Sequence, residues 1–184
     1  MKTTFVTVSL LLGLVLVRAP RVAAAQDRAS LEVGAGYSFL SGADVADGYG
    51  AGWMASLGWR CTDWLTLVGE AGGNRHEQAA GFLTVDADVH AFLAGAHIVL
   101  TVARLRPFVQ AQVGWSRLNL RVASAVPASV AHEDETDAAI QVGAGIDVPA
   151  AGRFDLRIAV AYRRVFAVEA VSQSRVMTGL VYRF

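Results

Sequence analysis

Apolar and polar residues alternate with a period of two along most of the chain from Ser30 onward. In the first such stretch, Leu31 and Val33 alternate with Glu32 and Gly34. Successive side chains of a β-strand point to opposite faces, so this pattern predicts strands that each have one apolar face. The eight strands expected on this basis are residues 31–39, 52–60, 65–72, 85–100, 109–116, 140–148, 155–163 and 175–184. The fourth is the least regular, because both of its faces are apolar beyond Phe92.

The connections between these segments are alternately short and long. The short ones are residues 61–63, 101–106 and 149–152, and the long ones are Leu40–Tyr49, Asn74–Thr84, Arg121–Asp137 and Arg164–Gln173. This alternation predicts an antiparallel up-and-down meander with one plain rim and one elaborated rim. An even number of strands allows the meander to close into a barrel, which removes both sheet edges.

The size of the apolar side chains indicates which face of the barrel points inward. The interior of an eight-stranded barrel is just wide enough to be filled by side chains. The polar face is rich in small residues and fits that space, whereas the apolar face carries bulky aromatic rings. An apolar belt on the outside would be unfavourable in water but is what lipid requires, and about ten residues suffice for a tilted strand to cross a bilayer. The sequence therefore predicts an all-β, eight-stranded antiparallel up-and-down transmembrane β-barrel.

The expected outward aromatic residues lie near the two rims of this barrel, as in the interfacial girdles of transmembrane barrels. Trp53 is placed slightly deeper than the others. The short-turn girdle is expected to contain Trp59, Phe108, Tyr182 and Phe184, and the long-loop girdle Tyr37, Phe39, Trp115 and Tyr162.

The first 25 residues have the features of a secretory signal peptide. Lys2 precedes an apolar stretch, Phe5–Val17, and Ala23-Ala24-Ala25 provides the small residues that a signal peptidase needs. We place the cleavage before Gln26, so residues 1–25 are the expected signal peptide and residues 26–184 a single barrel domain. Beyond residue 25 the longest uncharged run is Val89–Ala103, which is too short for a membrane-spanning helix.

The end of the chain, Gly179-Leu180-Val181-Tyr182-Arg183-Phe184, has a glycine, an aromatic residue three positions later and a terminal phenylalanine. In this respect the chain resembles the small eight-stranded outer-membrane β-barrel proteins of Gram-negative bacteria, of the OmpA and OmpX type. The resemblance covers about residues 29–184 and implies contact with membrane lipids, location in the outer membrane and recognition of Phe184 by the barrel-assembly machinery. One departure is Met177, where the family usually has a polar residue.

Charge and cysteine content argue against several classes of function. Removal of residues 1–25 leaves 13 arginines against 16 acidic residues, with no basic patch large enough to follow a nucleic acid backbone. We therefore expect no nucleic-acid partner. Cys61 is the only cysteine and can form neither an internal disulfide nor a zinc cluster.

Eight charged residues fall on the polar face that is expected to line the lumen. Buried charges are costly unless they are paired, so we expect ion pairs that stitch the barrel walls together, with Glu70 and Arg157 as the favoured pair. The alternative is gated passage of small ions through re-pairing of these contacts. The eight residues are Glu32, Glu70, Asp147, Asp155, Arg60, Arg157, Arg175 and Arg183.

Other candidate groups carry weaker signals. Asp86 and Asp88, and the run His132–Asp137, could attract Ca²⁺, but they lack the spacing of a calcium loop and are expected to be solvated loop faces. The His-x-Ser arrangement of lipid A deacylases is missing at all four histidines, which leaves a triad built on His90 and Asp88 as the enzymatic hypothesis. His97 is expected near the membrane interface and Cys61 in a turn. We expect no catalytic, cofactor-binding or metal site.

Taken together, these features predict an exported, monomeric, porin-like outer-membrane barrel of a Gram-negative cell envelope. The expected role is non-enzymatic: envelope integrity, or surface adhesion and interaction through the extracellular loops. A narrow ion pore and a lipid A-modifying enzyme are the membrane alternatives. A secreted, soluble, lipocalin-like barrel that binds an apolar ligand is the alternative outside the membrane.

Overall fold

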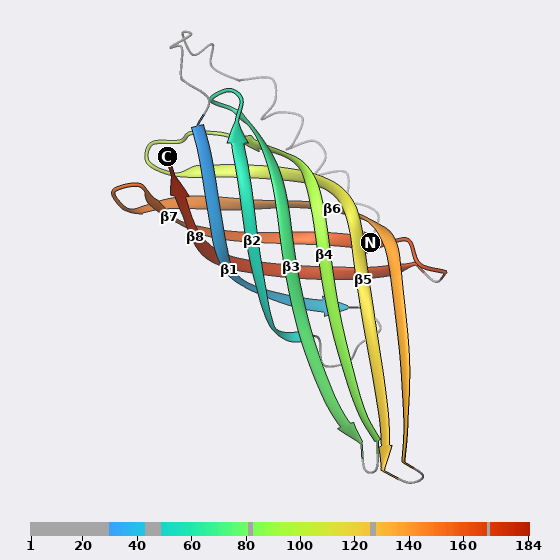
Figure 1. The fold of residues 1–184 in the computed structure, drawn as a ribbon. Coiled ribbons are helices and arrows are strands. Elements are labelled where there is room, and N and C mark those ends of the chain that lie inside the picture. Colours follow the sequence, from blue (N-terminus) through green and yellow to red (C-terminus); the bar gives the residue numbers. More distant parts are fainter. Residues whose placement is uncertain (1–29, 43–48, 81–82, 126–127, 169) are drawn as a thin grey trace, which may run out of the picture.

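The computed structural model describes residues 30–42, 49–80, 83–125, 128–168 and 170–184. Within these residues the chain forms eight antiparallel strands, each paired with the next, and β8 pairs with β1 to close a barrel (Figure 1). This confirms the predicted architecture; the expected signal peptide lies outside the described residues. The strands are β1 (Ser30–Gly42), β2 (Tyr49–Arg60), β3 (Leu65–Ala80), β4 (Leu83–Val99), β5 (Arg106–Ala125), β6 (Ala128–Ala151), β7 (Phe154–Val165) and β8 (Val171–Arg183). No helix in the described part of the chain is long and apolar enough to cross a membrane.

Two of the predicted long loops are mostly strand in the structure. Residues 74–84 and 121–137 were expected to be loops, but β3 and β4 stay paired up to Ala80 and Leu83, and β5 and β6 up to Ala125 and Ala128. Strand β5 has 20 residues and β6 has 24, about twice what a bilayer crossing needs. The hairpins β3–β4 and β5–β6 therefore project well beyond the ends of β1, β2, β7 and β8 (Figure 1).

The apolar face of the barrel points outward and the polar face inward, as the side-chain volumes predict. Trp53 and Trp115 are 49% and 64% exposed, whereas Gln112 and Gln141 are 1% and 0% exposed. The bulky apolar side chains thus form a belt suited to lipid. A soluble barrel that held an apolar ligand would need those side chains in its interior.

One aromatic residue of the predicted short-turn girdle faces the other way. Phe108 is buried in the lumen and stacks on His97, with ring centroids 4.8 Å apart. His97 is likewise buried in the lumen, so its side chain does not face the lipid, and its level near the membrane interface stays a prediction. The reason is the two-residue period: Phe108 shares the face of Gln110, whose side chain points inward. On the outside of the same rim, Phe154 packs beside Tyr182.

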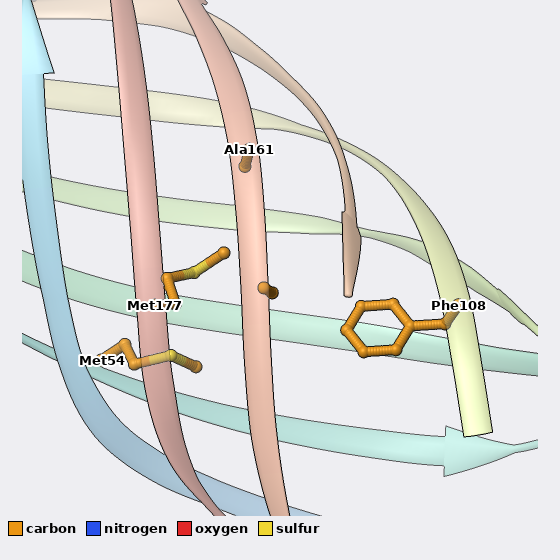
Figure 2. Close-up of a cluster of buried hydrophobic side chains, with 5 residues drawn as sticks. Met54, Phe108, Ala161 and Met177 are labelled. Carbon is orange, nitrogen blue, oxygen red and sulfur yellow. The ribbon is translucent and has the colours of Figure 1, made fainter. Parts of the chain in front are cut away.

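A small apolar cluster lies among the polar groups of the lumen. Met54, Met177 and Phe108 extend into it from β2, β8 and β5, and Ala159 and Ala161 complete it (Figure 2). Met177, which departs from the residue type usual in the family, is therefore part of the interior packing. A side chain at Gly145 would collide with Phe108, because a Cβ there would lie 2.5 Å from its ring.

Candidate functional site

Arg157 is the centre of an ion-pair network at the short-turn end of the lumen. Its Nε and Nη2 donate to the two carboxylate oxygens of Asp147 at 2.7 and 2.9 Å, and its Nη2 also lies 3.1 Å from Glu32 Oε1. The guanidinium also stands over the ring of Phe108, 4.9 Å from its centroid. This two-pronged geometry is the strongest form of arginine–carboxylate contact, and it offsets the cost of burying the charges.

Arg183 joins the same network from β8. It donates to Asp147 Oδ2 at 2.6 Å, lies 3.4 Å from Glu32 Oε2 and pairs with Asp155. Strands β1, β6, β7 and β8 each contribute to this cluster, so it ties together four of the eight strands. Of the eight charged residues predicted for the lumen, five are brought together here.

A second ion pair crosses the lumen further from the short-turn rim. Glu70 of β3 pairs with Arg175 of β8, and both side chains are buried. The predicted partner of Glu70, Arg157, was therefore wrong. Strands β3 and β8 are not neighbours, so the level at which their side chains meet depends on the stagger of the closed barrel. Spacing along the sequence does not contain that information.

The lumen also holds a chain of amide contacts. Gln141 donates through Nε2 to Gln112 Oε1 at 2.7 Å, and Arg163 donates through Nη2 and Nε to Gln141 Oε1 at 2.9 and 3.1 Å. Arg163 was missing from the set of expected lumen charges, although it shares the inward face of Arg157. Arg163 lies an even number of residues from Arg157 on β7, and this spacing could have identified it as an inward-facing residue.

These contacts describe an interior that its own side chains fill and cross-link. Three of the ion pairs, Arg157–Glu32, Arg183–Asp147 and Arg175–Glu70, join strands that are not adjacent in the sheet, as structural stitching of the barrel requires, and the other contacts join neighbouring strands. Re-pairing, which ion passage would need, would have to break buried charge-assisted hydrogen bonds.

On the projecting hairpins the hydrophobic pattern changes phase. Along the outward face of β5, Val113 and Trp115 are followed by Arg117 and Asn119, while the inward face becomes apolar at Leu118. The same change occurs on β4, where Phe92 faces outward and Val89 is buried on the inner side. Outward residues are apolar where lipid surrounds a barrel and polar where water does. The row of Phe92 and Trp115, which are register partners, therefore marks the membrane boundary.

Beyond that row, the outward face carries charges of both signs. Arg75 lies 3.7 Å from Asp86 and 3.9 Å from Asp88, and Arg117 Nη2 donates to Asp134 Oδ2 at 3.0 Å. These pairs are partly exposed to solvent and contribute little to stability, so Arg75 and Arg117 can exchange them for contacts with a partner. A hollow of 440 Å³ opens beside them, lined by His90, Phe92, Arg117, Asn119, Arg121 and Asp134.

The remaining candidates take ordinary positions. Asp86 and Asp88 face Arg75, and no group of three or more metal-ligating side chains occurs among the described residues. His90 lines the outer hollow, while Cys61 is exposed in a turn as predicted. The side chains of His76 and of His132 and Glu133 in the predicted acidic run lie outside the described set.

Comparisons with known proteins agree with this geometry. The family described as outer membrane protein beta-barrel domain matches residues 9–184. A major outer membrane protein from Thermus thermophilus is similar in structure, with a TM-score of 0.70 and 9% identity over 86% of this chain and 100% of that one. Neisserial surface protein A has a TM-score of 0.60 and 16% identity, covering 85% of this chain and 97% of its own.

A third similar structure is Ail, the attachment invasion locus protein of Yersinia pestis, solved in complex with the heparin analogue sucrose octasulfate. It has a TM-score of 0.59 and 15% identity, over 85% of this chain and 97% of that chain. At these identities the structures establish a common fold. No curated protein matches the sequence significantly.

Proposed function

Because the chain belongs to the outer membrane protein β-barrel family, we propose that it is a non-enzymatic surface protein that binds partners outside the cell through its two projecting hairpins. The barrel is embedded in the outer membrane, and its cross-linked lumen provides a rigid base for these hairpins. In transmembrane barrels the short turns lie in the periplasm and the longer connections outside the cell. The hairpins β3–β4 and β5–β6 thus form the extracellular surface.

The length of these hairpins is the observation that carries the proposal. Strands β5 and β6 remain paired over about ten residues beyond the row of Phe92 and Trp115, far more than lipid insertion needs. Long strands that serve only to cross the membrane would end at that row, as β7 does near Val165. The extra length raises a stiff, two-hairpin sheet above the lipid.

The chemistry of this surface suits a charged partner. Arg117 and Asp134 have side chains that are 54% and 41% exposed, and Arg121 and His90 line the hollow beside them. Guanidinium groups recognise sulfate, phosphate and carboxylate groups. The heparin analogue bound to Ail makes a sulfated polysaccharide the natural first probe.

Shortening the hairpins tests the proposal. Replacing Arg75–Asp88 and Arg117–Thr136 each by Asn-Gly removes the projecting ends with their charged outward side chains, keeps the paired strands below and supplies a two-residue hairpin turn. We expect a folded, heat-modifiable barrel that no longer retains immobilised heparin or host-cell surfaces when displayed on cells. Unchanged adhesion of the shortened protein would refute the proposal.

A finer comparison replaces arginines on and off the hairpins. Arg117→Gln with Arg121→Gln should weaken heparin retention, whereas Arg164→Gln should not. Arg164 is an exposed arginine at the same end of the barrel, but it lies on β7, outside the hairpins. Equal losses in the two variants would indicate a general charge effect instead of a surface on the hairpins.

We also propose the route by which the barrel reaches the membrane. Residues 1–25 act as a signal peptide cleaved before Gln26, the domain of residues 26–184 is monomeric, and the barrel-assembly machinery recognises Phe184. The features that support this are the charged start at Lys2, the apolar stretch Phe5–Val17 and the aromatic residues that end the chain. Amino-terminal sequencing of the membrane-inserted protein should begin at Gln26.

A further inference from the structure

The periplasmic mouth of the barrel is an arginine-rich hollow. It has a volume of 670 Å³, and the end of β2, the β4–β5 turn, the β6–β7 turn and the end of β8 all contribute to its lining. Its five arginines are Arg60, Arg104, Arg106, Arg153 and Arg183. Such a concentration of one charge at one mouth is unexpected in a chain whose overall formal charge is zero.

The carboxylates near this hollow are already engaged. Asp155, the acidic side chain in the lining, pairs with Arg183. The deeper Glu32 and Asp147 are held by Arg157 and Arg183.

The other four arginines of the lining have no such directly paired carboxylate among the described residues, although Arg106 also lies near the charges of Asp147 and Glu32. None of them takes part in an ion pair found within the described part of the chain: they are Arg60, Arg104, Arg106 and Arg153. Since like charges gathered in a concave site attract anions, the hollow carries a net positive potential.

Two tight turns hold part of this lining in place. The β4–β5 turn is closed by hydrogen bonds from Val102 N to Leu105 O at 2.9 Å and from Leu105 N to Val102 O at 3.0 Å. Arg104 lies at its tip, next to Ala103, whose φ is 56°. In the next turn of the same rim, between β6 and β7, Arg153 follows Gly152, whose φ is 57°. Fixed turns reduce the cost of ordering the arginines around a ligand.

The direction of these side chains favours a ligand dissolved in the periplasm over a lipid headgroup. Arg60, Arg106 and Arg183 share the inward face with Glu32 and Phe108 and do not project into the surrounding lipid. Guanidinium groups bind phosphate oxygens through paired hydrogen bonds. Four separate segments contribute arginines, so an anion with several charged groups can contact more of them than a single ion can.

We propose that this hollow is a periplasmic binding site for a soluble anion that carries two or more phosphate groups. This site lies at the opposite end of the barrel from the extracellular hairpins and does not depend on them. The probe is pyrophosphate, titrated calorimetrically into the full barrel in phosphatidylcholine nanodiscs at low ionic strength. We expect saturable binding that weakens as salt is added, because salt screens exposed charges.

The variants localise the site. Arg104→Gln with Arg153→Gln should weaken binding by about tenfold for each arginine removed, as expected for charge-assisted hydrogen bonds. The control Arg75→Gln with Arg164→Gln removes the same charge at the other end of the barrel and should leave the affinity unchanged. Arg104→Lys with Arg153→Lys keeps the charge but loses the paired geometry and should fall between the two. Heat-modifiable mobility verifies folding of each variant.

Two outcomes overturn the proposal. The first is absence of saturable pyrophosphate binding to the folded wild-type barrel, or an equal loss in the control variant. The second is occupation of the hollow by a lipid headgroup. In that case phosphatidylglycerol nanodiscs would stabilise the wild-type barrel but not the variant Arg104→Gln with Arg153→Gln, and soluble pyrophosphate would not bind.

Discussion

Arg175 is buried in the lumen with a carboxylate in front of it and empty space around it. Arg175 is 1% exposed and pairs with Glu70 across the barrel. A Cβ added at Gly72 would lie 2.7 Å from Arg175 Nη2, so the glycine provides the space that the guanidinium occupies. The small residues of the inward face thus make room for the few large charged ones.

This arrangement predicts strong coupling between Glu70 and Arg175. Arg175→Gln leaves the Glu70 carboxylate buried without its partner and should reduce the free energy of unfolding by about 3–5 kcal/mol. Adding Glu70→Gln removes the stranded charge, so the double variant should be more stable than Arg175→Gln alone. Urea unfolding of the barrel in detergent, followed by tryptophan fluorescence, measures all three variants. Losses that simply add would show that the two residues act independently.

Some of these residue positions could be predicted from the sequence and others could not. The inward direction of Glu70, Arg175, Arg157 and Phe108 follows from the alternation of side chains along each strand. Phe108 was nevertheless expected to face outward, because an aromatic residue near the rim was assigned to the girdle. The partner of Glu70 does not follow, because β3 and β8 are separated by two strands and their relative level depends on closure of the whole barrel.

At the scale of the strand, the phase of the alternation between apolar and polar residues shows where a strand leaves the membrane. Within the membrane the outward residues are apolar, and beyond Trp115 and Phe92 they are polar. The segments 121–137 and 74–84 resemble loops in composition, which is why their strand structure was not predicted. On β5, however, the alternation continues in reversed phase through Arg117, Leu118 and Asn119. The surrounding medium changes at that row, while the backbone pairing continues.

This boundary can be tested by placing one charge on either side of it. Ala111 faces outward on β5 in the middle of the apolar belt, and Thr136 faces outward on β6 as the register partner of Arg117. Ala111→Arg should cost about 2–4 kcal/mol, the penalty of an arginine near the bilayer midplane, and Thr136→Arg about 0–1 kcal/mol. Reversible unfolding from lipid vesicles measures both. Similar costs at the two positions would place the membrane boundary elsewhere.

At the scale of the whole molecule, the barrel exists only when the first and last strands pair. Strand β8 pairs with β1 from Gln173 to Arg183, and the backbone N–H of Phe184 donates to Leu31 O at 3.0 Å. Every other neighbouring pair is joined by a connection within the hairpin meander. Closure therefore joins the two most distant strands in sequence, and such long-range pairings form slowly.

The proposed role of Phe184 in assembly can be tested separately from its contribution to the stability of the finished barrel. Its ring is 64% exposed on the outer surface, and its contacts are the Leu31 hydrogen bond and an edge-on approach to Tyr182 with centroids 4.9 Å apart. Loss of one hydrogen bond and one aromatic contact costs about 1–3 kcal/mol in total. A barrel without Phe184 should therefore still refold in detergent and keep its heat-modifiable mobility.

If the assembly machinery recognises Phe184, as proposed, the same deletion should sharply reduce the amount of protein inserted in the outer membrane of cells. Phe154→Ala is the matched control, since Phe154 is an exposed aromatic of the same rim and also contacts Tyr182. It should insert normally. Normal insertion without Phe184 would refute its role in assembly, and equal defects in both variants would trace the effect to the girdle. A defect confined to cells and to the Phe184 deletion would support recognition of this residue during assembly.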